Sequence, residues 1–570
     1  MTALGPVDLV IRGGRVASVQ TGELFAAEVA VTAGLIRAVL PPGTPVTAAQ
    51  EIDADGRIVV PGFVDAHMHI ESALITPGEF ARIALARGTT TVLADPHEIV
   101  NVAGRDAMAW MIEQGRRSPM TMRWAVPSCV PALEGFETAG ATLTADDIDT
   151  MLSWDGVTTL GEVMDYRAVV SGEPRMRDII SAARRHGVRL DGHCPNLSGA
   201  DLNAYMWAGI DSDHTKNTPE VLREKARLGM LPMLQEKSLT SEVVDVLLSL
   251  PVLPEFCVVT DDLVADAILD RGHLDHVARV AIRRGLPPWS VLRALTLHPA
   301  RRLGLADRGV VAPGLRADLV LVDSLELLHP ALVIAEGVVV GRDGVYTGPE
   351  IPVAANPFAG SVHLAPLEEI PWSVDLPDGD HTFRAIRVNG VDTYTVPDEV
   401  VLPVRDGVVE WAGRTAVAVV IERHRSTGNR TFVPIVGFDL EEGGFATTYA
   451  HDSHNLTLLG TSPEHLVRAA NHVIGFGGGM ALERPGHSVV ALPLPVGGVM
   501  SDQPAERVAR QTGELRAALI DWGWANANPF MSVSTLGLPV SPELKVTDQG
   551  LVRVVERAWE PQLVGGTRIP

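Results

Sequence analysis

Short apolar runs alternate with stretches of helical periodicity between residues 58 and 303. We predict strands at 58–66, 89–95, 122–130, 157–164, 187–193, 209–213, 230–235 and 256–260. Helical patterns separate most of them, as at 78–88 and 175–187, and further helices are predicted at 274–285 and 288–303. Eight strands with intervening helices in about 240 residues are the number and size of a (β/α)₈ barrel. The alternation therefore predicts an α/β fold with such a barrel at its centre.

β-like runs separated by turns flank the predicted barrel on both sides, and the sequence pattern changes again after residue 352. We expect residues 1–60 and 306–352 to form one small β-rich domain from the two flanking segments. The barrel itself would occupy residues 61–305. Residues 353–570 mix β-like runs with longer helical patterns, which predicts a separate C-terminal α+β domain.

Composition restricts the partners that the protein can have. The net charge of −23 disfavours nucleic acid and anionic membranes, whereas a small neutral or cationic substrate would tolerate it. Three scattered cysteines form no CxxC motif, and the first residues do not resemble a signal peptide. No apolar run approaches the roughly 18 residues that a membrane helix needs. We therefore expect a soluble cytoplasmic protein that binds neither nucleic acid nor membrane. A homo-oligomer is also expected.

Two histidines stand where the first predicted barrel strand ends. Side chains alternate along a strand, so His67 and His69 point the same way. Two imidazoles on one face can hold one metal ion. With 18 histidines in 570 residues, roughly 0.6 such pairs are expected by chance, so the pair alone is weak evidence.

Acidic and imidazole side chains also stand at the ends of other predicted strands. In chain order they are Asp95, His97, Glu98, Glu162, His193, His214, Asp261 and Asp262. Each has a structural alternative, because a histidine can serve as a hydrogen-bonding group and an acidic residue can cap a helix. Active sites of such barrels lie at the carboxyl ends of the strands, so these groups would converge at one mouth. Jointly they favour a two-metal site.

Several longer strings resemble one known family. The segment PGFVDAHMHIESALITPGEFARIALARGTTTVLADPHEIVNVAG closely resembles the corresponding stretch of adenine deaminases in the amidohydrolase superfamily. GEVMDY, DGHCPNLSGADLNAYMWAGIDSDHT and VVTDD resemble the later motifs of those enzymes in the same order. AHDSHNLTLLGTS, GFGGGMALE and PLPVGGVMSD resemble their additional C-terminal domain. The likeness spans nearly the whole chain.

The resemblance implies a set of metal ligands. His67, His69 and Asp261 would bind one ion, and His193 and His214 would bind a second. Glu162 would bridge the two ions.

A bridging carboxylate also fits the lysine content of the chain. Many members of the superfamily bridge the metals with a carboxylated lysine on the fourth strand, but no lysine precedes Lys216 here. A glutamate supplies the same two hard oxygens. This argues against a hydantoinase or a dihydroorotase.

The implied reaction is the hydrolysis of adenine, a small purine base, to hypoxanthine and ammonia. Two divalent ions would make water nucleophilic near neutral pH. The resemblance favours Mn²⁺, and the mixed nitrogen and carboxylate ligands also admit Fe²⁺ or Zn²⁺. Asp261 would carry the proton of the water toward the departing amine. Glu98, His97 and Glu236 stand at suitable strand ends to protonate the ring, and the sequence does not choose among them.

Departures from the family pattern keep alternatives open. Gln235 stands where many relatives carry an arginine, so a deaminase of an N6-substituted aminopurine remains an alternative, as does a cyclic amide hydrolase. A non-catalytic scaffold is a third. Asp262 competes with Asp261 for the role at the eighth strand. His451 and His454 would either form a hydrogen-bonded turn or reach the mouth of the active site.

Overall fold

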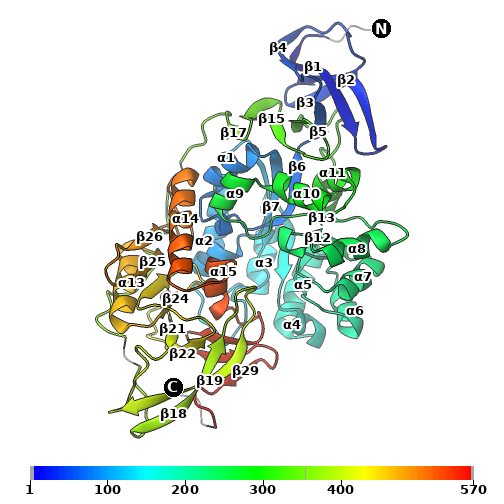
Figure 1. Cartoon of the computed structure of the whole chain (residues 1–570). Coiled ribbons are helices and arrows are strands. Elements are labelled where there is room, and N and C mark those ends of the chain that lie inside the picture. The colour runs from blue at the N-terminus through cyan, green and yellow to red at the C-terminus, as the bar shows by residue number, and fades with distance from the viewer. Residues whose placement is uncertain (1–4, 354, 371, 566–570) are drawn as a thin grey trace.

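Parallel strands alternate with helices around the centre of the computed structural model, which describes residues 5–353, 355–370 and 372–565 (Figure 1). The barrel strands are β6 (Phe63–Met68), β7 (Thr89–Ala94), β8 (Thr121–Val126), β9 (Val157–Val163), β10 (Arg189–Gly192), β11 (Ser212–Asp213), β12 (Leu231–Leu234) and β13 (Cys257–Val258). They form a five-stranded sheet, β10-β9-β8-β7-β6, and a three-stranded sheet, β11-β12-β13. A parallel bridge between Met68 and Asp261 joins the two sheets at one seam.

Helices connect successive barrel strands, and those from Ala265 onward follow the last strand, β13. They are α1 (Pro77–Leu85), α2 (His97–Gly115), α3 (Ala145–Leu152), α4 (Tyr166–Ser171), α5 (Pro174–His186), α6 (Gly199–Trp207), α7 (Pro219–Arg227), α8 (Ser241–Ser249), α9 (Ala265–Arg271), α10 (Leu274–Arg283), α11 (Pro288–Leu295) and α12 (Leu297–Arg302). In α5 the apolar residues Met176, Ile179 and Ala183 recur at helical spacing and are buried. The single helix predicted at 288–303 is instead two helices, because the backbone leaves helical geometry at Thr296.

The strand predicted at 58–66 is wrong, because it is two strands in different sheets. β5 (Ile58–Pro61) ends before β6 begins, and it pairs outside the barrel. Gly62 separates them, and a Cβ there would lie 2.3 Å from Oγ1 of Thr90. Only glycine allows the chain to pass from one sheet to the other at this point.

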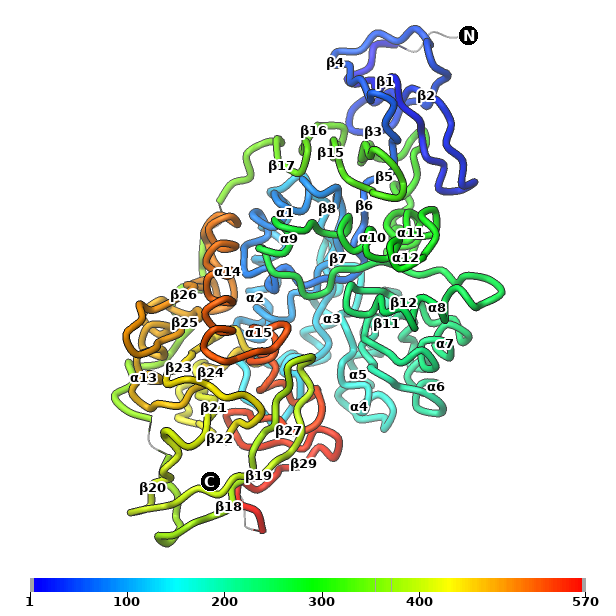
Figure 2. Tube along the Cα trace, in the orientation of Figure 1, coloured from blue at the N-terminus to red at the C-terminus, as the bar shows by residue number. Residues whose placement is uncertain are grey.

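β5 belongs to a nine-stranded sheet that draws strands from both sides of the barrel in the sequence. The other members are β1 (Val7–Ser18), β2 (Glu23–Thr32), β3 (Leu35–Leu40), β4 (Ala48–Asp53), β14 (Leu319–Val322), β15 (Pro330–Ala335), β16 (Val338–Arg342) and β17 (Val345–Tyr346). β5 lies between β1, its parallel neighbour, and β14, its antiparallel neighbour. In the tube of Figure 2 the blue N-terminal strands and the green strands of this sheet meet above the barrel.

A second nine-stranded sheet lies in the C-terminal part of the chain. Its strands are β18 (Gly379–Arg387), β19 (Val396–Arg405), β20 (Val408–Val409), β21 (Ala416–Ile421), β22 (Arg430–Val436), β23 (Gly444–Thr447), β24 (Leu456–Gly460), β25 (Gly479–Glu483) and β26 (Val490–Pro493). Three helices and a three-stranded sheet accompany it: α13 (Pro463–Gly475), α14 (Ala505–Asp521), α15 (Pro529–Ser534), β27 (Leu544–Thr547), β28 (Gly550–Arg553) and β29 (Ala558–Glu560). None of the described helices is both long and apolar enough to cross a bilayer.

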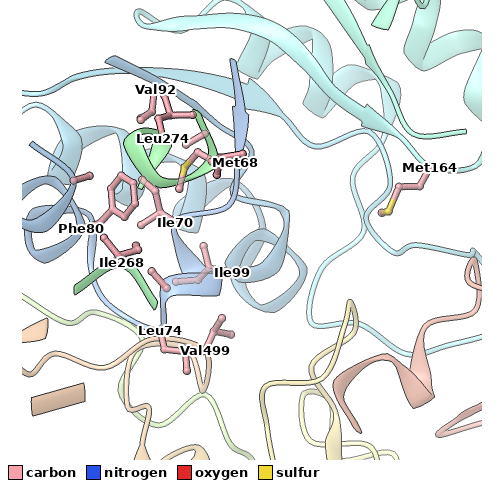
Figure 3. Close-up of a cluster of buried hydrophobic side chains, with 14 of the residues drawn as sticks. Met68, Ile70, Leu74, Phe80, Val92, Ile99, Met164, Ile268, Leu274 and Val499 are labelled. Carbon is pink, nitrogen blue, oxygen red and sulfur yellow. The ribbon is translucent and has the colours of Figure 1, made fainter. Parts of the chain in front are cut away.

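The barrel and the C-terminal part share one hydrophobic core. Leu74, which follows the first barrel strand, lies beside Val499 in Figure 3, and both are buried. The Ser501 amide donates a hydrogen bond of 2.9 Å to the carbonyl oxygen of Leu74. The C-terminal part therefore packs directly on loops that follow the barrel strands.

Candidate metal centre

Two imidazoles and a carboxylate meet where the first and last barrel strands end. His67 Nε2 lies 3.6 Å from Asp261 Oδ1, and His69 Nε2 lies 3.3 Å from the same oxygen. All three side chains are buried, and their ligand atoms lie within 4.8 Å of one another. This is the first half of the candidate centre.

The second half consists of Glu162, His193 and His214. Glu162 Oε2 lies 2.6 Å from His193 Nδ1 and 3.0 Å from His214 Nε2. The other oxygen of Glu162 lies 3.6 Å from His69 Nε2, which belongs to the first half. One carboxylate thus faces both halves, and the six predicted ligands lie together.

Main-chain geometry places Asp261. Its φ of +57° is in the left-handed region, which a residue other than glycine rarely adopts. The Asp261 amide donates to the carbonyl oxygen of His67, and the His69 amide donates to that of Asp261, each over 3.3 Å. Such a conformation costs about 1–3 kcal/mol and persists only where the surroundings fix it. Here the bridge to the first strand fixes it and turns the carboxylate toward the imidazoles.

Further contacts orient the imidazoles. His69 Nδ1 donates a hydrogen bond of 2.9 Å to the carbonyl oxygen of Asp95, which leaves a lone pair on Nε2. His67 Nδ1 lies 3.5 Å from Asp191 Oδ2. Among the described residues, none forms a hydrogen bond with His67 Nε2, although this atom is buried and faces Asp261. A buried nitrogen without a partner, next to carboxylates and other imidazoles, fits a divalent cation.

The charges of this group balance one another. Burial by itself would raise the pKa of Glu162, but His193 and His214 hold it well below its usual range. Burial would likewise raise the pKa of Asp261, and Lys237, His67 and His69 hold it low instead. Burial and His97 would lower the pKa of His69, yet the neighbouring carboxylates raise it to about 9. A metal ion would therefore have to displace protons from the imidazoles.

A second buried cluster joins the barrel to the C-terminal part. Glu98 Oε1 lies 2.5 Å from His451 Nδ1 and 3.3 Å from His97 Nε2, and the other Glu98 oxygen contacts His454 Nε2. His97 Nδ1 lies 3.6 Å from Glu162 Oε1, so the cluster adjoins the candidate centre. Both interpretations of His451 and His454 hold: the Ala450 amide donates to His454 Nδ1 over 3.2 Å within a turn, and both imidazoles contact Glu98 beside the candidate centre.

Glu236 does not join the other predicted catalytic residues. Its carboxylate lies 3.2 Å from Arg271 and 3.0 Å from His276. The chain enters a short 3₁₀ helix at Glu236–Ser238 directly after β12, which turns Glu236 away. The neighbouring Lys237 instead places Nζ 3.2 Å from Asp261 Oδ2.

Two other sequence-based questions have structural answers. Gln235 is buried, and its Nε2 donates a hydrogen bond of 2.8 Å to the carbonyl oxygen of His214. It therefore supports a predicted ligand. Asp262 accepts a hydrogen bond of 2.6 Å from Ser72, whereas Asp261 faces the imidazoles.

Sequence reasoning did not identify Asp191 and Lys237 as neighbours of the site, whereas Asp452 belongs to the AHDSHN segment that was left open between a turn and the active-site mouth. Asp191 carried a usable signal, because it precedes His193 by two residues in the strand predicted at 187–193 and would share its face there. Asp452 lies 3.9 Å from His97 Nε2 and comes from the C-terminal part. No local pattern links such distant segments.

Comparisons with known proteins agree with this geometry. Residues 58–349 match the model of the amidohydrolase family, and residues 392–558 match that of the adenine deaminase C-terminal domain. The adenine deaminase of Desulfatibacillum aliphaticivorans is 37% identical over 565 residues, which cover 96% of each chain. The chain belongs to the adenine deaminase family. The predicted resemblance is thereby confirmed.

Other members of the adenine deaminase family match over a similar length. The adenine deaminase of Cereibacter sphaeroides strain KD131 is 39% identical, over 97% of this chain and 96% of its own. Adenine deaminase 2 of Shouchella clausii is 36% identical, over 96% of this chain and 97% of its own. The family match and the curled parallel sheet together support the predicted hydrolase barrel.

Proposed function

We propose that this protein is an adenine deaminase that hydrolyses adenine to hypoxanthine and ammonia. Membership of the family over nearly the whole chain supports this function. The observation that carries the chemistry is the position of Glu162, a buried residue whose two oxygens face the two halves of one ligand set. Water adds at C6 of the purine, and the exocyclic amine leaves as ammonia.

Two divalent ions are the proposed cofactors, with Mn²⁺ preferred and Fe²⁺ or Zn²⁺ as alternatives. His67, His69 and Asp261 would hold one ion, His193 and His214 the other, and Glu162 would contact both. When bound, such ions lower the pKa of coordinated water and so supply hydroxide near neutral pH. The imidazole and carboxylate donors suit all three metals.

The protein's own side chains would move the protons. Asp261 lies next to His67 and His69, where it can accept a proton from water and pass it to the leaving amine. We assign protonation of the ring to the pair His97 and Glu98, which lies beside Glu162. Glu236 is not retained for this role, because Arg271 and His276 engage it.

The remaining expectations from the sequence stay predictions. The chain is expected to divide into domains at the segments 1–60, 61–305, 306–352 and 353–570. The protein is expected to be cytoplasmic and to form a homo-oligomer. The proposed partner is a small purine base, without nucleic acid or membrane.

A substrate panel tests the proposed function. Protein loaded with Mn²⁺ is incubated with adenine, N6-substituted adenines and cyclic amides while ammonia release and loss of substrate are followed. We expect adenine to be the preferred substrate and chelation to abolish turnover. Hydrolysis of an N6-substituted adenine, which releases the substituted amine, without hydrolysis of adenine would overturn the proposed substrate. Hydrolysis of a cyclic amide alone would overturn the proposed deaminase activity.

A further inference from the structure

The ladder of the barrel is interrupted between β10 and β11, the two strands that lead to His193 and His214. The five-stranded sheet ends at β10 and the three-stranded sheet begins at β11. The strands still touch, because a Cβ on Gly192 would lie 2.1 Å from the carbonyl oxygen of Ser212. The Gly192 amide donates to Oγ of Ser212 over 3.4 Å. Something other than a ladder of main-chain hydrogen bonds must therefore set the spacing of these strand ends.

Side chains satisfy the main-chain donors along this seam. The His193 amide donates to the Tyr205 hydroxyl over 3.1 Å, and the Cys194 amide donates to Asp213 Oδ1 over 3.0 Å. Buried amides need such partners, and in a continuous sheet they would find them in the neighbouring strand. Asp213 thus takes the place of a main-chain acceptor.

A buried lysine completes the connection. Lys225 lies on α7, is 1% exposed, and donates to three oxygens. The acceptors are the Cys194 carbonyl oxygen at 2.6 Å, Asp213 Oδ2 at 2.9 Å and Asn217 Oδ1 at 2.8 Å. An ammonium group has three N–H bonds, so each one is used. A charge this deep is retained only with such partners.

The bonded residues are direct neighbours of two candidate ligands. Cys194 follows His193 in the chain, and Asp213 precedes His214. His193 Nδ1 and His214 Nε2 lie 3.2 Å apart. We propose that Lys225 is a positioning residue that fixes the separation of His193 and His214 and thereby the metal affinity of the second half. The inference rests on the proposed function, since it concerns the same centre.

The test replaces the lysine and measures metal binding as well as activity. Contacts of this indirect kind typically change metal affinity by about 10–100-fold, so we expect Lys225→Met to weaken the binding of one of the two Mn²⁺ ions, that of the second half, by such a factor. Equilibrium dialysis with metal analysis gives the affinity. The Mn²⁺ concentration for half-maximal deamination should rise in parallel, while the KM for adenine stays unchanged at saturating Mn²⁺. Lys216→Met, an exposed lysine in the loop after His214, is the matched control and should behave as wild type.

A second variant covers the case in which Lys225→Met does not fold. The double variant Asp213→Asn, Lys225→Met leaves no uncompensated buried charge but still lacks the bond to Cys194. Circular dichroism and thermal melting establish that it is folded, and the same loss of Mn²⁺ affinity is expected. If either variant is folded and binds Mn²⁺ as tightly as wild type, the proposal is overturned.

The outcomes also separate this proposal from the proposed function. A wild-type protein that binds one ion per chain overturns the role of Lys225, because no second ion exists for it to affect. A wild-type protein that binds two ions but does not deaminate adenine overturns the function alone. Dialysis of the lysine variants then still decides the role of Lys225.

Discussion

The two halves of the candidate centre are held in place by different means. In the first half, main-chain hydrogen bonds between His67, Asp261 and His69 join the last strand to the first. In the second half, the ladder is interrupted, and the side chains of Asp213 and Lys225 connect the strand ends.

This difference predicts different tolerance to substitution. A main-chain bridge persists when a neighbouring side chain is changed, because every residue type except proline supplies the same donor and acceptor. A buried ion pair is lost when either partner is changed, and the remaining charge is then uncompensated. Single substitutions away from the ligands should therefore affect the second half more than the first.

The largest effect is expected from the residue that the two halves share. In Glu162→Gln an amide replaces one anionic oxygen with an NH₂ group, which is no metal ligand. We expect metal to be lost from both halves and ammonia release to fall to background. Metal analysis after gel filtration measures the first effect, with Glu220→Gln on the exposed face of α7 as the control. Wild-type metal content in Glu162→Gln would contradict the bridging position.

Asp261→Asn separates metal binding from proton transfer in the first half. The amide oxygen can still face His67 and His69, so part of the metal should remain bound. Loss of a general acid–base group lowers turnover by about 10²–10⁴-fold, and we expect kcat to fall within that range. Steady-state kinetics at saturating Mn²⁺ provide the measurement. Near-normal turnover would rule out a role of Asp261 in proton transfer.

Metal removal should change how stability depends on pH. In protein from which a chelator has removed the metal, the pKa of His69 is about 9, above its ordinary value of 6.5. The folded state then binds the extra proton between these values, so this contribution to stability is complete below pH 6.5 and is lost as pH rises through 9. The loss is on the order of 1 kcal/mol per pH unit. Urea denaturation at several pH values checks it, and Mn²⁺-loaded protein should lack this loss.

The smallest effect is expected behind the first half. Thr260 Oγ1 donates to the buried carboxylate of Asp65 over 2.6 Å, and Thr260→Val would leave that oxygen unsatisfied. The free energy of unfolding should fall by about 1–3 kcal/mol. The control is Thr121→Val, at the first residue of β8 and therefore at the end of that strand away from the mouth of the barrel. Because the main-chain bridge remains, Mn²⁺ affinity should change less than in Lys225→Met; an equal or larger change would contradict the comparison.

The candidate ligands were predictable because each depends on a local pattern. A histidine or a carboxylate at the carboxyl end of a barrel strand is placed near the mouth of the barrel, where active sites of this fold lie. His67, His193 and His214 follow this rule, and the resemblance to the family supplied their pairing.

Other features depend on geometry that no local pattern records. The direction of the turn after β12 decides that Glu236 faces Arg271 while Lys237 faces Asp261. The contact between Glu98 and His451 joins segments that are far apart in the chain. The boundary at Gly62 depends on Thr90 of the neighbouring strand. Each requires the packed structure.

The pairing of β5 with β14 has a consequence for biosynthesis. β5 leaves the ribosome early, but its antiparallel neighbour is made only after every strand of the barrel. Until then one edge of β5 is open, and open strand edges recruit other chains. Pairing with β14 covers that edge and joins the segment before the barrel to the segment after it. A truncated product would keep this edge open to pairing with another chain.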